Sequence, residues 1–458
     1  MSGLGDELRA LLGAKAVADD GETFAAHSGD KWFAHEAPEV VLFAETTEQV
    51  STVLRFANER RIPVTPRGAG FGYVGGCVPV KRGIALSLAR MNRIKEINFA
   101  DAVAIVEPGV ITGVLQAEVR KQKLFYPPDP ASLNDCSIGG NVATNAGGPR
   151  CLKYGVTRNY VAGLEVVLAN GDVLKTGGRV HKNKTGFDLL GLFVGSEGML
   201  GVVTEITCRL IPHPPARATL SASFSAMAEA AAAVQEIFAR GFLPSSLEIA
   251  DHFTLEAARQ DHGSASVPPG DAHLLLDVDG QAESVRGEIE QLRKLVAAMT
   301  PQALVIATEE VDCEKLWALR RAFSNALRAT GLTKLNQDIV VPRSRLVDLV
   351  RFAESLRAEF GFPIATFGHA GDGNIHVNIM ADHYNRDAAV RVKVEQALDR
   401  LFQQVLAWGG VITGEHGIGL AKKRWWPQAT SEVARELHRN LKKTLDPNGI
   451  LNPGKFLD

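Results

Sequence analysis

Two glycine-rich segments in the first half of the chain decide the fold: PRGAGFGYVGG at residues 66–76 and SIGGNVATNAGG at residues 137–148. Glycine has no Cβ, so the backbone N–H groups of such loops can approach an anion such as a pyrophosphate closely. We therefore interpret both segments as candidate phosphate-binding loops. For either segment taken alone, an ordinary glycine-rich turn is the alternative.

The first segment also contains a match to a dinucleotide-binding fingerprint. Gly70, Gly72 and Gly75 have the GxGxxG spacing and follow a strand-like run. A Rossmann loop opens a helix, whereas VPV at 78–80 and a second strand-like run at 84–88 follow here. No acidic residue stands near the expected ribose-binding offset of about 20 residues. The context argues against a Rossmann site.

The regions around these loops predict a mixed α/β first half. A strand-like run at 40–44, a helix with Thr46 and Gln49 in capping positions, and a run at 62–65 predict a β-α-β start. In GLEVVLANGDVLKT (163–176) an Asn-Gly pair separates two strand-like runs, which is a strong hairpin signal.

The composition changes near Pro212, where prolines cluster, and strands then alternate with Ala- and Glu-rich helices. Glycine and proline punctuation returns after about residue 409. We predict a first domain over 1–212, a second domain over 213–408, and a C-terminal segment over 409–458 that packs back onto the first domain.

Length and charge limit the function classes. A chain of 458 residues with 45% apolar residues is expected to form two or three packed domains. The 50 basic and 52 acidic residues give a formal charge of −2, without a run of like charge. This balance argues against nucleic acid as a partner.

The N-terminal residues and the cysteines indicate a cytoplasmic protein. Residues 1–20 have no basic start and no continuous apolar region, so we expect no secretory signal. No apolar stretch approaches the roughly 20 residues of a membrane span, so any association with the inner membrane would be peripheral, through a partner. Five cysteines without a CxxC pair suit reduced, buried thiols.

The two glycine clusters, with their flanking residues, resemble the FAD-binding domain of the vanillyl-alcohol oxidase family, also called the p-cresol methylhydroxylase (PCMH) type. Three motifs occur in the family's order: PRGAGFGYVGG (66–76), YPPDPASLNDCSIGGNVATNAGG (126–148) and GLFVGSEGMLGVVTEITCRLIP (191–212). The resemblance implies FAD contacts at Arg67, Gly68, Ala69, Gly70, Phe71, Gly72, Pro130, Ser132, Gly139, Gly140, Asn141, Thr144, Asn145, Glu197, Gly201 and Val203.

One departure from this family concerns how the flavin is attached. Some relatives place a histidine near the end of the first loop and link it covalently to the flavin. Here that place corresponds to Phe71, which has no nucleophile. We therefore expect non-covalent FAD.

A second constellation lies in the C-terminal half. In HAGDGNIHVN (369–378) a tight turn separates two histidines, and GEHGIG (414–419) places a carboxylate beside an imidazole. Two histidines and one carboxylate suit a catalytic divalent metal such as Zn, Mn or Fe. Taken singly, each histidine could instead be a hydrogen-bonded structural residue, and Asp372 could simply fill the turn.

These two motifs and the terminal LDPNGILNPGKF (445–456) resemble the C-terminal half of the FAD-linked D-lactate, D-2-hydroxyglutarate and glycolate dehydrogenases. The resemblance implies an α+β fold with a two-subdomain PCMH-type FAD-binding domain (1–212) and an inserted α+β antiparallel-sheet substrate or cap domain (213–408). A C-terminal segment (409–458) is expected to pack back on the FAD domain and complete the active site. The resemblance also implies metal ligands at His369, His376 and Glu415, substrate binding by Asn378, and a catalytic base at His416.

The expected chemistry explains these residue types. Oxidation of a 2-hydroxy acid removes the hydroxyl proton, and a cation lowers the pKa of that hydroxyl. An imidazole near neutral pH can accept the proton, which suits His416, although a structural role is the alternative. The substrate carboxylate calls for a bidentate arginine, and the resemblance places it at Arg320 as a further catalytic residue.

Neighbours of Arg320 bear on specificity. Arg321 points about 100° away on a helix, so only one of the two arginines should enter the site. Ser324 is one turn beyond Arg320, where some relatives have a threonine. The lysine that 2-hydroxyglutarate-specific relatives use has no clean counterpart, because Lys334 is out of register and Asn336 stands near that place. We expect a monocarboxylate such as lactate or glycolate.

The sequence therefore predicts a dehydrogenase that converts a small D-2-hydroxy acid to the 2-oxo acid. The chain has no iron–sulfur cysteine motif. Reoxidation of the flavin should involve an electron-transferring flavoprotein, a quinone-linked protein or companion subunits. The sequence leaves the oligomeric state open, with a homodimer as one alternative. The rivals are D-2-hydroxyglutarate dehydrogenase, an alcohol or sugar oxidase without the metal, a non-catalytic FAD subunit of a glycolate oxidase-like complex, and a nicotinamide-dependent reductase.

Overall fold

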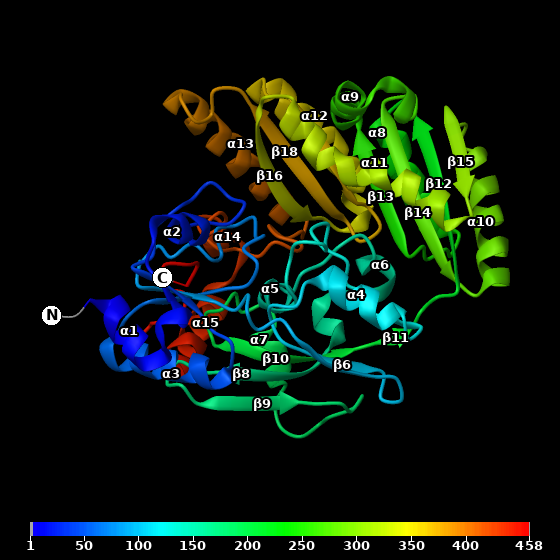
Figure 1. Cartoon of the computed structure of the whole chain (residues 1–458). Helices are drawn as coiled ribbons and strands as arrows, with labels where there is room; N and C mark the ends of the chain where they lie inside the picture. The colour runs from blue at the N-terminus through cyan, green and yellow to red at the C-terminus, as the bar shows by residue number, and fades with distance from the viewer. Residues whose placement is uncertain (1–2, 458) are drawn as a thin grey trace. The chain divides into compact units, whose positions relative to one another are not determined.

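The computed structural model describes residues 3–457, and the chain divides into two compact units (Figure 1). Unit 1 comprises Met1–Gly147, Val156–His213 and Glu415–Asp458. Unit 2 comprises Gly148–Gly155 and Pro214–Gly414. No helix in the described part of the chain combines the length and apolar character needed to cross a membrane.

Unit 1 begins its first sheet with the predicted β-α-β arrangement. Strand β2 (Val40–Phe43) pairs in parallel with β4 (Ile84–Ser87), and β3 (Val64–Arg67) pairs in parallel with the other edge of β4. Helix α3 (Thr47–Arg60) connects β2 to β3, and the Thr46 side chain accepts a hydrogen bond from the Gln49 N–H. No helix lies between β3 and β4, as the argument against a Rossmann site predicts.

The second sheet of unit 1 has five antiparallel strands in the order β5-β6-β10-β8-β9, in which β5 spans Ile94–Asn98 and β6 spans Val103–Val106. The predicted hairpin is present, since β8 (Val161–Val167) pairs antiparallel with β9 (Val173–Gly177). Gly171 in the connecting turn has φ 83°, which favours glycine. Strand β10 (Val202–Arg209), which lies within the third motif, is the central strand of this sheet.

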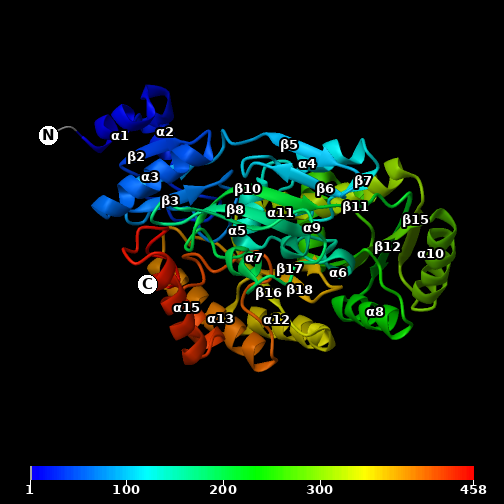
Figure 2. The same ribbon diagram turned by 90° about the horizontal axis from the view of Figure 1, so that it is seen from below.

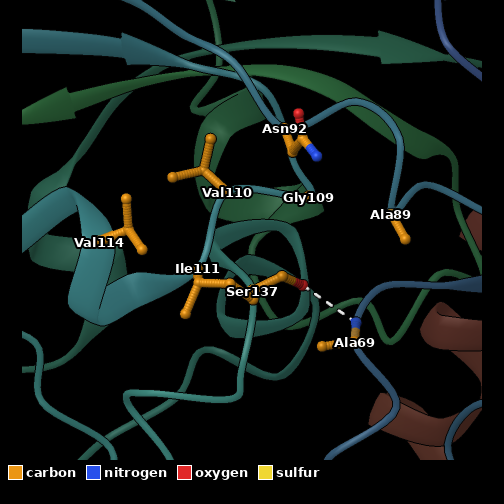
Figure 3. A pocket seen from close by; sticks show the side chains of 8 residues that line it. All are labelled: Ala69, Ala89, Asn92, Gly109, Val110, Ile111, Val114 and Ser137. Atoms are coloured by element: carbon orange, nitrogen blue, oxygen red, sulfur yellow. Dashed lines mark hydrogen bonds between the residues drawn. The ribbon is translucent and has the colours of Figure 1, made fainter.

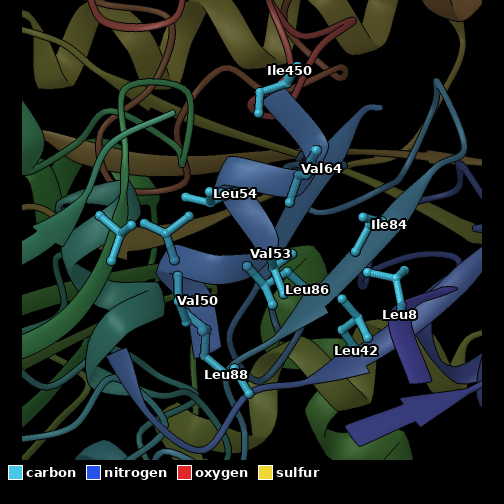
Figure 4. Packing of buried hydrophobic residues seen from close by; sticks show 14 of the residues in the cluster. Leu8, Leu42, Val50, Val53, Leu54, Val64, Ile84, Leu86, Leu88 and Ile450 are labelled. Carbon is cyan, nitrogen blue, oxygen red and sulfur yellow. The ribbon is translucent and has the colours of Figure 1, made fainter. Parts of the chain in front are cut away.

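The C-terminal tail belongs to the core of unit 1. Ile450 and Leu451 are buried in the cluster that includes Leu54, Val64 and Leu86 (Figure 4). The Val64 N–H donates to the Ile450 carbonyl at 2.7 Å. Burial of such side chains contributes about 1.5–3 kcal/mol each, so the tail is an integral part of this unit.

The remaining elements of unit 1 connect and cover these sheets. Its other strands are β1 (Val17–Ala18), β5 (Ile94–Asn98), β6 (Val103–Val106), β7 (Leu124–Phe125) and β11 (Ile211–Pro212). Its other helices are α1 (Leu4–Leu12), α2 (Gly21–His27), α4 (Thr112–Arg120), α5 (Ile138–Thr144), α7 (Leu189–Phe193), α14 (Trp426–Ala429) and α15 (Glu432–Leu445).

Unit 2 is built on one seven-stranded antiparallel sheet in the order β15-β12-β14-β13-β17-β18-β16. Its strands are β12 (Ala216–Phe224), β13 (Ser246–Asp251), β14 (Ala272–Gly280), β15 (Ala303–Ala307), β16 (Thr333–Val340), β17 (Ile364–His369) and β18 (Asn374–Ala381). This sheet is the antiparallel sheet expected of the cap.

Helices cover both faces of this sheet (Figure 2). Helices α9 (His252–His262) and α11 (Glu310–Ala329) pack on the face that carries Phe367, in a cluster with Phe323 and Leu255. The opposite face is covered by α8 (Met227–Ala239), α10 (Ala282–Ala297), α12 (Leu346–Phe360) and α13 (Ala388–Ala407), and unit 2 also contains α6 (Cys151–Tyr154).

Candidate active site

The two predicted phosphate-binding loops lie against each other in unit 1. Ser137 caps α5 and accepts hydrogen bonds from the backbone N–H groups of Gly140 (3.3 Å) and Ala69 (3.2 Å; Figure 3). A Cβ on Gly68 would lie only 2.5 Å from Ser137 Oγ. The loops can approach this closely only because a side chain is missing at this position.

A cavity of about 430 Å³ opens beside these loops (Figure 3). It is lined by Ala69, Ala89, Asn92, Gly109, Val110, Ile111, Val114 and Ser137. None of these side chains is charged, so backbone N–H and hydroxyl groups would have to bind an anion here. The volume lies in the range of cofactor pockets. The two loops and this cavity, together called the cradle below, therefore fit part of a phosphate-containing cofactor.

The side chain of Arg67 supports the first loop from within unit 1. Its guanidinium donates to the carbonyls of Gly29 (2.6 Å) and Ala26 (3.1 Å). A Cβ on Gly70, which has φ 74°, would lie 2.0 Å from this guanidinium. Phe71 at the end of the loop has the Lys31 ammonium 4.4 Å from its ring centroid. The sequence did not indicate that the Arg67 guanidinium donates hydrogen bonds to backbone carbonyls.

Several other residues predicted to contact FAD form side-chain hydrogen bonds with neighbouring residues. Asn141 Nδ2 donates to Thr112 Oγ1 (2.6 Å), and Thr144 Oγ1 donates to the Gly140 carbonyl (3.3 Å). Asn145 Oδ1 accepts from the Arg158 N–H (2.8 Å). The remaining members lie in turns or close packing: Pro130 and Ser132 in the turn before α5, Gly139 against Pro108, Gly201 against Val166, and Val203 in β10.

His416 lies on the first glycine loop, within unit 1. Its ring stacks on Tyr73, with centroids 5.2 Å apart and planes at 28°. The Leu420 N–H donates to the Val74 carbonyl (2.7 Å), which fixes the next turn of the same segment. His416 Nε2 is 3.7 Å from Glu415 Oε1. Tyr73 was not identified from the sequence, although it belongs to the quoted loop.

The two predicted metal-binding histidines lie on one face of the unit 2 sheet. Residues directly paired across antiparallel strands share a face, and His376 is paired with Phe367, two residues before His369. The ring centroids of His369 and His376 are 5.7 Å apart, and both side chains are buried. The turn therefore folds the first imidazole back towards the second, as the sequence predicts.

Asn378 lies on the same face and is fully buried. Its Nδ2 donates to the Ala365 carbonyl (3.0 Å), while its Oδ1 accepts no hydrogen bond from the described residues. Asn336, directly opposite on β16, also has an Oδ1 without a donor among these residues. Buried hydrogen-bond acceptors normally have donors. The Oδ1 atoms of Asn378 and Asn336 are therefore suited to accept hydrogen bonds from a bound ligand.

Glu248 joins two of the predicted site residues. Its Oε2 accepts from Arg320 Nε (2.7 Å) and pairs with Nη2 (2.5 Å), while Oε1 lies 2.6 Å from His369 Nδ1. Burial alone would raise the pKa of Glu248, but the charge of Arg320 and the ring of His369 outweigh it and lower the pKa to about 2. We missed this residue, although a glutamate inside the strand-like SLEIAD was a visible signal.

Arg320 and Arg321 point in different directions from α11. Arg320 is 8% exposed and lies 4.9 Å from the centroid of Phe367, whereas Arg321 is exposed and pairs with Glu314 at 2.8 Å. Ser324 Oγ accepts from Lys334 Nζ at 2.7 Å. Burial, followed by the charges of Arg328 and Arg320, lowers the pKa of Lys334 to about 7.

Asp338 anchors the chain that leads to Glu415. This fully buried carboxylate accepts from Thr413 Oγ1 and from the Gly414 N–H, both at 2.9 Å, and from Asn374 Nδ2 at 2.6 Å. Asn374 ends the turn that separates the two histidines. Gly414 is bonded directly to Glu415, so the same carboxylate restrains the turn and the peptide before Glu415.

Two family models match the chain. A model described as "FAD binding domain" matches residues 38–177, and one described as "FAD linked oxidases, C-terminal domain" matches residues 213–456. A solved structure of p-cresol methylhydroxylase with substrate bound superposes with a TM-score of 0.82 at 21% identity, covering 99% of this chain and 96% of that one. These findings confirm the predicted α+β, PCMH-type fold.

Two curated relatives resemble nearly the whole chain. "Glycolate oxidase subunit GlcD" of Bacillus subtilis (strain 168) is 40% identical over 420 residues, covering 92% of this chain and 89% of that protein. "D-lactate dehydrogenase" of Anaerostipes hadrus is 35% identical over 426 residues, covering 92% and 89%. Both similarities extend through the glycine clusters and the histidine motifs.

Proposed function

The chain belongs to the family of FAD-linked oxidases, and from this premise we propose that it is a metal-assisted dehydrogenase that oxidises a small D-2-hydroxy acid, D-lactate or glycolate, to the 2-oxo acid. The observation that carries the proposal is the buried Glu248 carboxylate, which holds both Arg320 and His369. Glu248 thus orients both the Arg320 guanidinium, which is suited to bind a substrate carboxylate, and the His369 imidazole, which is suited to bind a metal.

We propose that FAD is bound non-covalently by the two glycine clusters. The close approach at Gly68 and the uncharged lining of the cavity support this assignment. Phe71 offers no nucleophile for a covalent link. When bound, the flavin supplies the acceptor for the Cα hydrogen, transferred as hydride.

We propose that His369, His376 and Glu415 hold a divalent cation, Zn with Mn and Fe as alternatives. Hydrogen bonding of His369 Nδ1 to Glu248 makes Nε2 the coordinating nitrogen, as in carboxylate–histidine–metal arrays. Asp338 restrains the peptide before Glu415. When bound, the cation supplies positive charge that stabilises a developing alkoxide.

Binding and proton transfer fall to other side chains. The guanidinium of Arg320, fixed along its Nε edge by Glu248, binds the substrate carboxylate. Asn378 accepts a hydrogen bond through the buried Oδ1, and Ser324 lies one turn from Arg320. His416, stacked on Tyr73, accepts the hydroxyl proton.

A second candidate substrate is D-2-hydroxyglutarate. Lys334 is out of the register expected from the sequence, yet its Nζ donates to Ser324 Oγ. A second cation beside Arg320 favours a substrate with a second carboxylate. We keep the monocarboxylates first, because the lowered pKa of Lys334 leaves its charge incomplete near neutral pH.

Electrons must leave the flavin through another redox group. The name "glycolate oxidase subunit" of one relative favours companion subunits as partners. An electron-transferring flavoprotein or a quinone-linked protein remains an alternative. We propose a cytoplasmic location, with the C-terminal segment from about residue 409 completing the active site.

The proposal is tested by anaerobic flavin reduction. FAD-loaded, metal-loaded protein is mixed with D-lactate, L-lactate, glycolate or D-2-hydroxyglutarate, and the oxidised-flavin absorbance near roughly 450 nm is followed. We expect bleaching by D-lactate or glycolate and not by L-lactate. An absence of bleaching with all four acids would favour the non-catalytic subunit, and bleaching by NADH alone would favour a reductase.

A further inference from the structure

The segment that carries His416 is folded around a buried carboxylate. Glu197 is 8% exposed, and its two oxygens accept hydrogen bonds from the N–H groups of Ile418 and Gly419, both at 2.8 Å. A Cβ on Gly417 would lie 2.8 Å from Glu197 Oε1. Successive backbone N–H groups that converge on one anion form a nest, and here the anion is a side chain of the same unit.

The glycines of this segment are needed for that geometry. Gly417 has φ 86° and Gly419 has φ 48°, both in the left-handed region that favours glycine. A Cβ on Gly419 would also lie 2.3 Å from the Val74 carbonyl of the first glycine loop. The segment can therefore surround the Glu197 carboxylate and contact the first glycine loop at the same time.

Glu197 is itself held on two other sides. Its N–H donates to the Ala143 carbonyl in α5 (2.8 Å), and its carbonyl accepts from Asn452 Nδ2 (2.7 Å). Its φ of 50° is unusual for a residue other than glycine and costs about 1–3 kcal/mol. Such a conformation persists only where the surroundings fix it. Glu197 thus ties the second glycine cluster, the C-terminal tail and the His416 segment together.

We propose that Glu197 is the positioning residue for His416: its carboxylate fixes the backbone immediately after the base, so that the imidazole stays stacked on Tyr73. The inference rests on the proposed function, in which His416 accepts the substrate proton. It assigns the Glu197 carboxylate a role different from the cofactor contact expected from the sequence. Two N–H donors on that carboxylate leave less of its capacity for the flavin.

The test compares Glu197→Gln with wild type in the full-length, FAD-loaded and metal-loaded protein. Glutamine keeps one acceptor oxygen but presents an NH2 group to the second backbone N–H. We expect unchanged FAD content and a KM within about twofold. The rate of flavin reduction should fall roughly 10- to 100-fold, because a small displacement of a proton acceptor has that effect. Glu205→Gln is the matched control, since Glu205 pairs with Lys95 at a partly exposed site and should behave as wild type.

Two further measurements separate positioning from general loss of structure. Backbone amide exchange at Ile418 and Gly419 should accelerate in Glu197→Gln, with exchange elsewhere in unit 1 unchanged. In a His416→Ala background, Glu197→Gln should cause no additional loss of rate, because residues that act as one unit are not additive. Additive losses, loss of FAD, or wild-type exchange at 418–419 would overturn the proposal.

A second variant approaches the contact from the other side. If Glu197→Gln does not fold, Gly417→Ala places a Cβ against Glu197 Oε1 and should give the same fall in rate and faster exchange. A wild-type rate in Gly417→Ala would contradict the inference. If wild-type protein reduces no flavin with any 2-hydroxy acid, the proposed function fails, and the exchange measurement still decides whether Glu197 orders this segment.

Discussion

Replacing Glu248 with glutamine should disconnect Arg320 from His369. The carboxylate is 1% exposed and uses Oε2 for Arg320 and Oε1 for His369. A glutamine has the same shape but only one acceptor oxygen. If that oxygen faces Arg320, the NH2 group faces His369 Nδ1 and forces the ring to carry its proton on Nε2, the proposed metal-binding nitrogen. If it faces His369, the NH2 group opposes a buried guanidinium.

Either orientation loses one buried, charge-assisted contact. Hydrogen bonds to charged groups contribute about 1.5–3 kcal/mol each, and a buried charge left without its partner costs about 3–5 kcal/mol. We therefore expect unit 2 to lose on the order of 3 kcal/mol of stability. Loss of a carboxylate that orients a ligating histidine typically lowers metal affinity 10- to 100-fold.

Metal affinity is measured by competition with a chromophoric chelator, and stability by thermal unfolding, for Glu248→Gln and the wild type. Glu256→Gln is the control, because Glu256 is partly exposed on α9 and pairs with Arg259. FAD content should be equal in all three proteins, since the cradle lies in unit 1. Wild-type metal affinity together with wild-type stability in Glu248→Gln would refute the reasoning.

Three further predictions concern the other proposed groups. Arg320→Lys replaces a planar fork with a point charge, so KM for the hydroxy acid should rise roughly 10- to 100-fold, whereas Arg321→Lys should leave it unchanged in steady-state assays. Burial lowers the pKa of Lys334 to about 7, so its protonated fraction falls about tenfold from pH 6 to pH 8, and KM for an anion that binds this charge should rise by up to roughly tenfold over that range; a flat profile, or the same rise in Lys334→Met, would contradict this. Gly68→Ala places a Cβ 2.5 Å from Ser137 Oγ, so the purified protein should contain much less FAD by absorbance, and full FAD content would argue against the cradle.

Local sequence patterns were sufficient for the elements that depend on neighbouring residues. The Asn-Gly hairpin, the capped helix after β2 and the turn between His369 and His376 each depend on residues within about ten positions. Helical spacing also separated Arg320 from Arg321. These features follow from backbone preferences and periodicity, which a sequence displays directly.

The missed features depend on partners far apart in the chain. Glu248 contacts His369 across 121 positions, and Glu197 contacts Ile418 across 221. A charged residue in a strand-like or glycine-rich run indicates that this charge needs a partner once it is buried. The sequence does not show which distant residue is that partner. The assignment of Gly148–Gly155 to unit 2 has the same origin, since Lys153 pairs with Asp279.

Metal dependence of flavin reduction tests the central claim most directly. FAD-loaded protein is treated with EDTA, separated from the chelator, and mixed anaerobically with the acid that bleaches it best, before and after addition of Zn or Mn. The account predicts that chelation slows flavin reduction at least roughly 100-fold while FAD stays bound, and that the metal restores it. Full-rate reduction by metal-depleted protein would contradict the account.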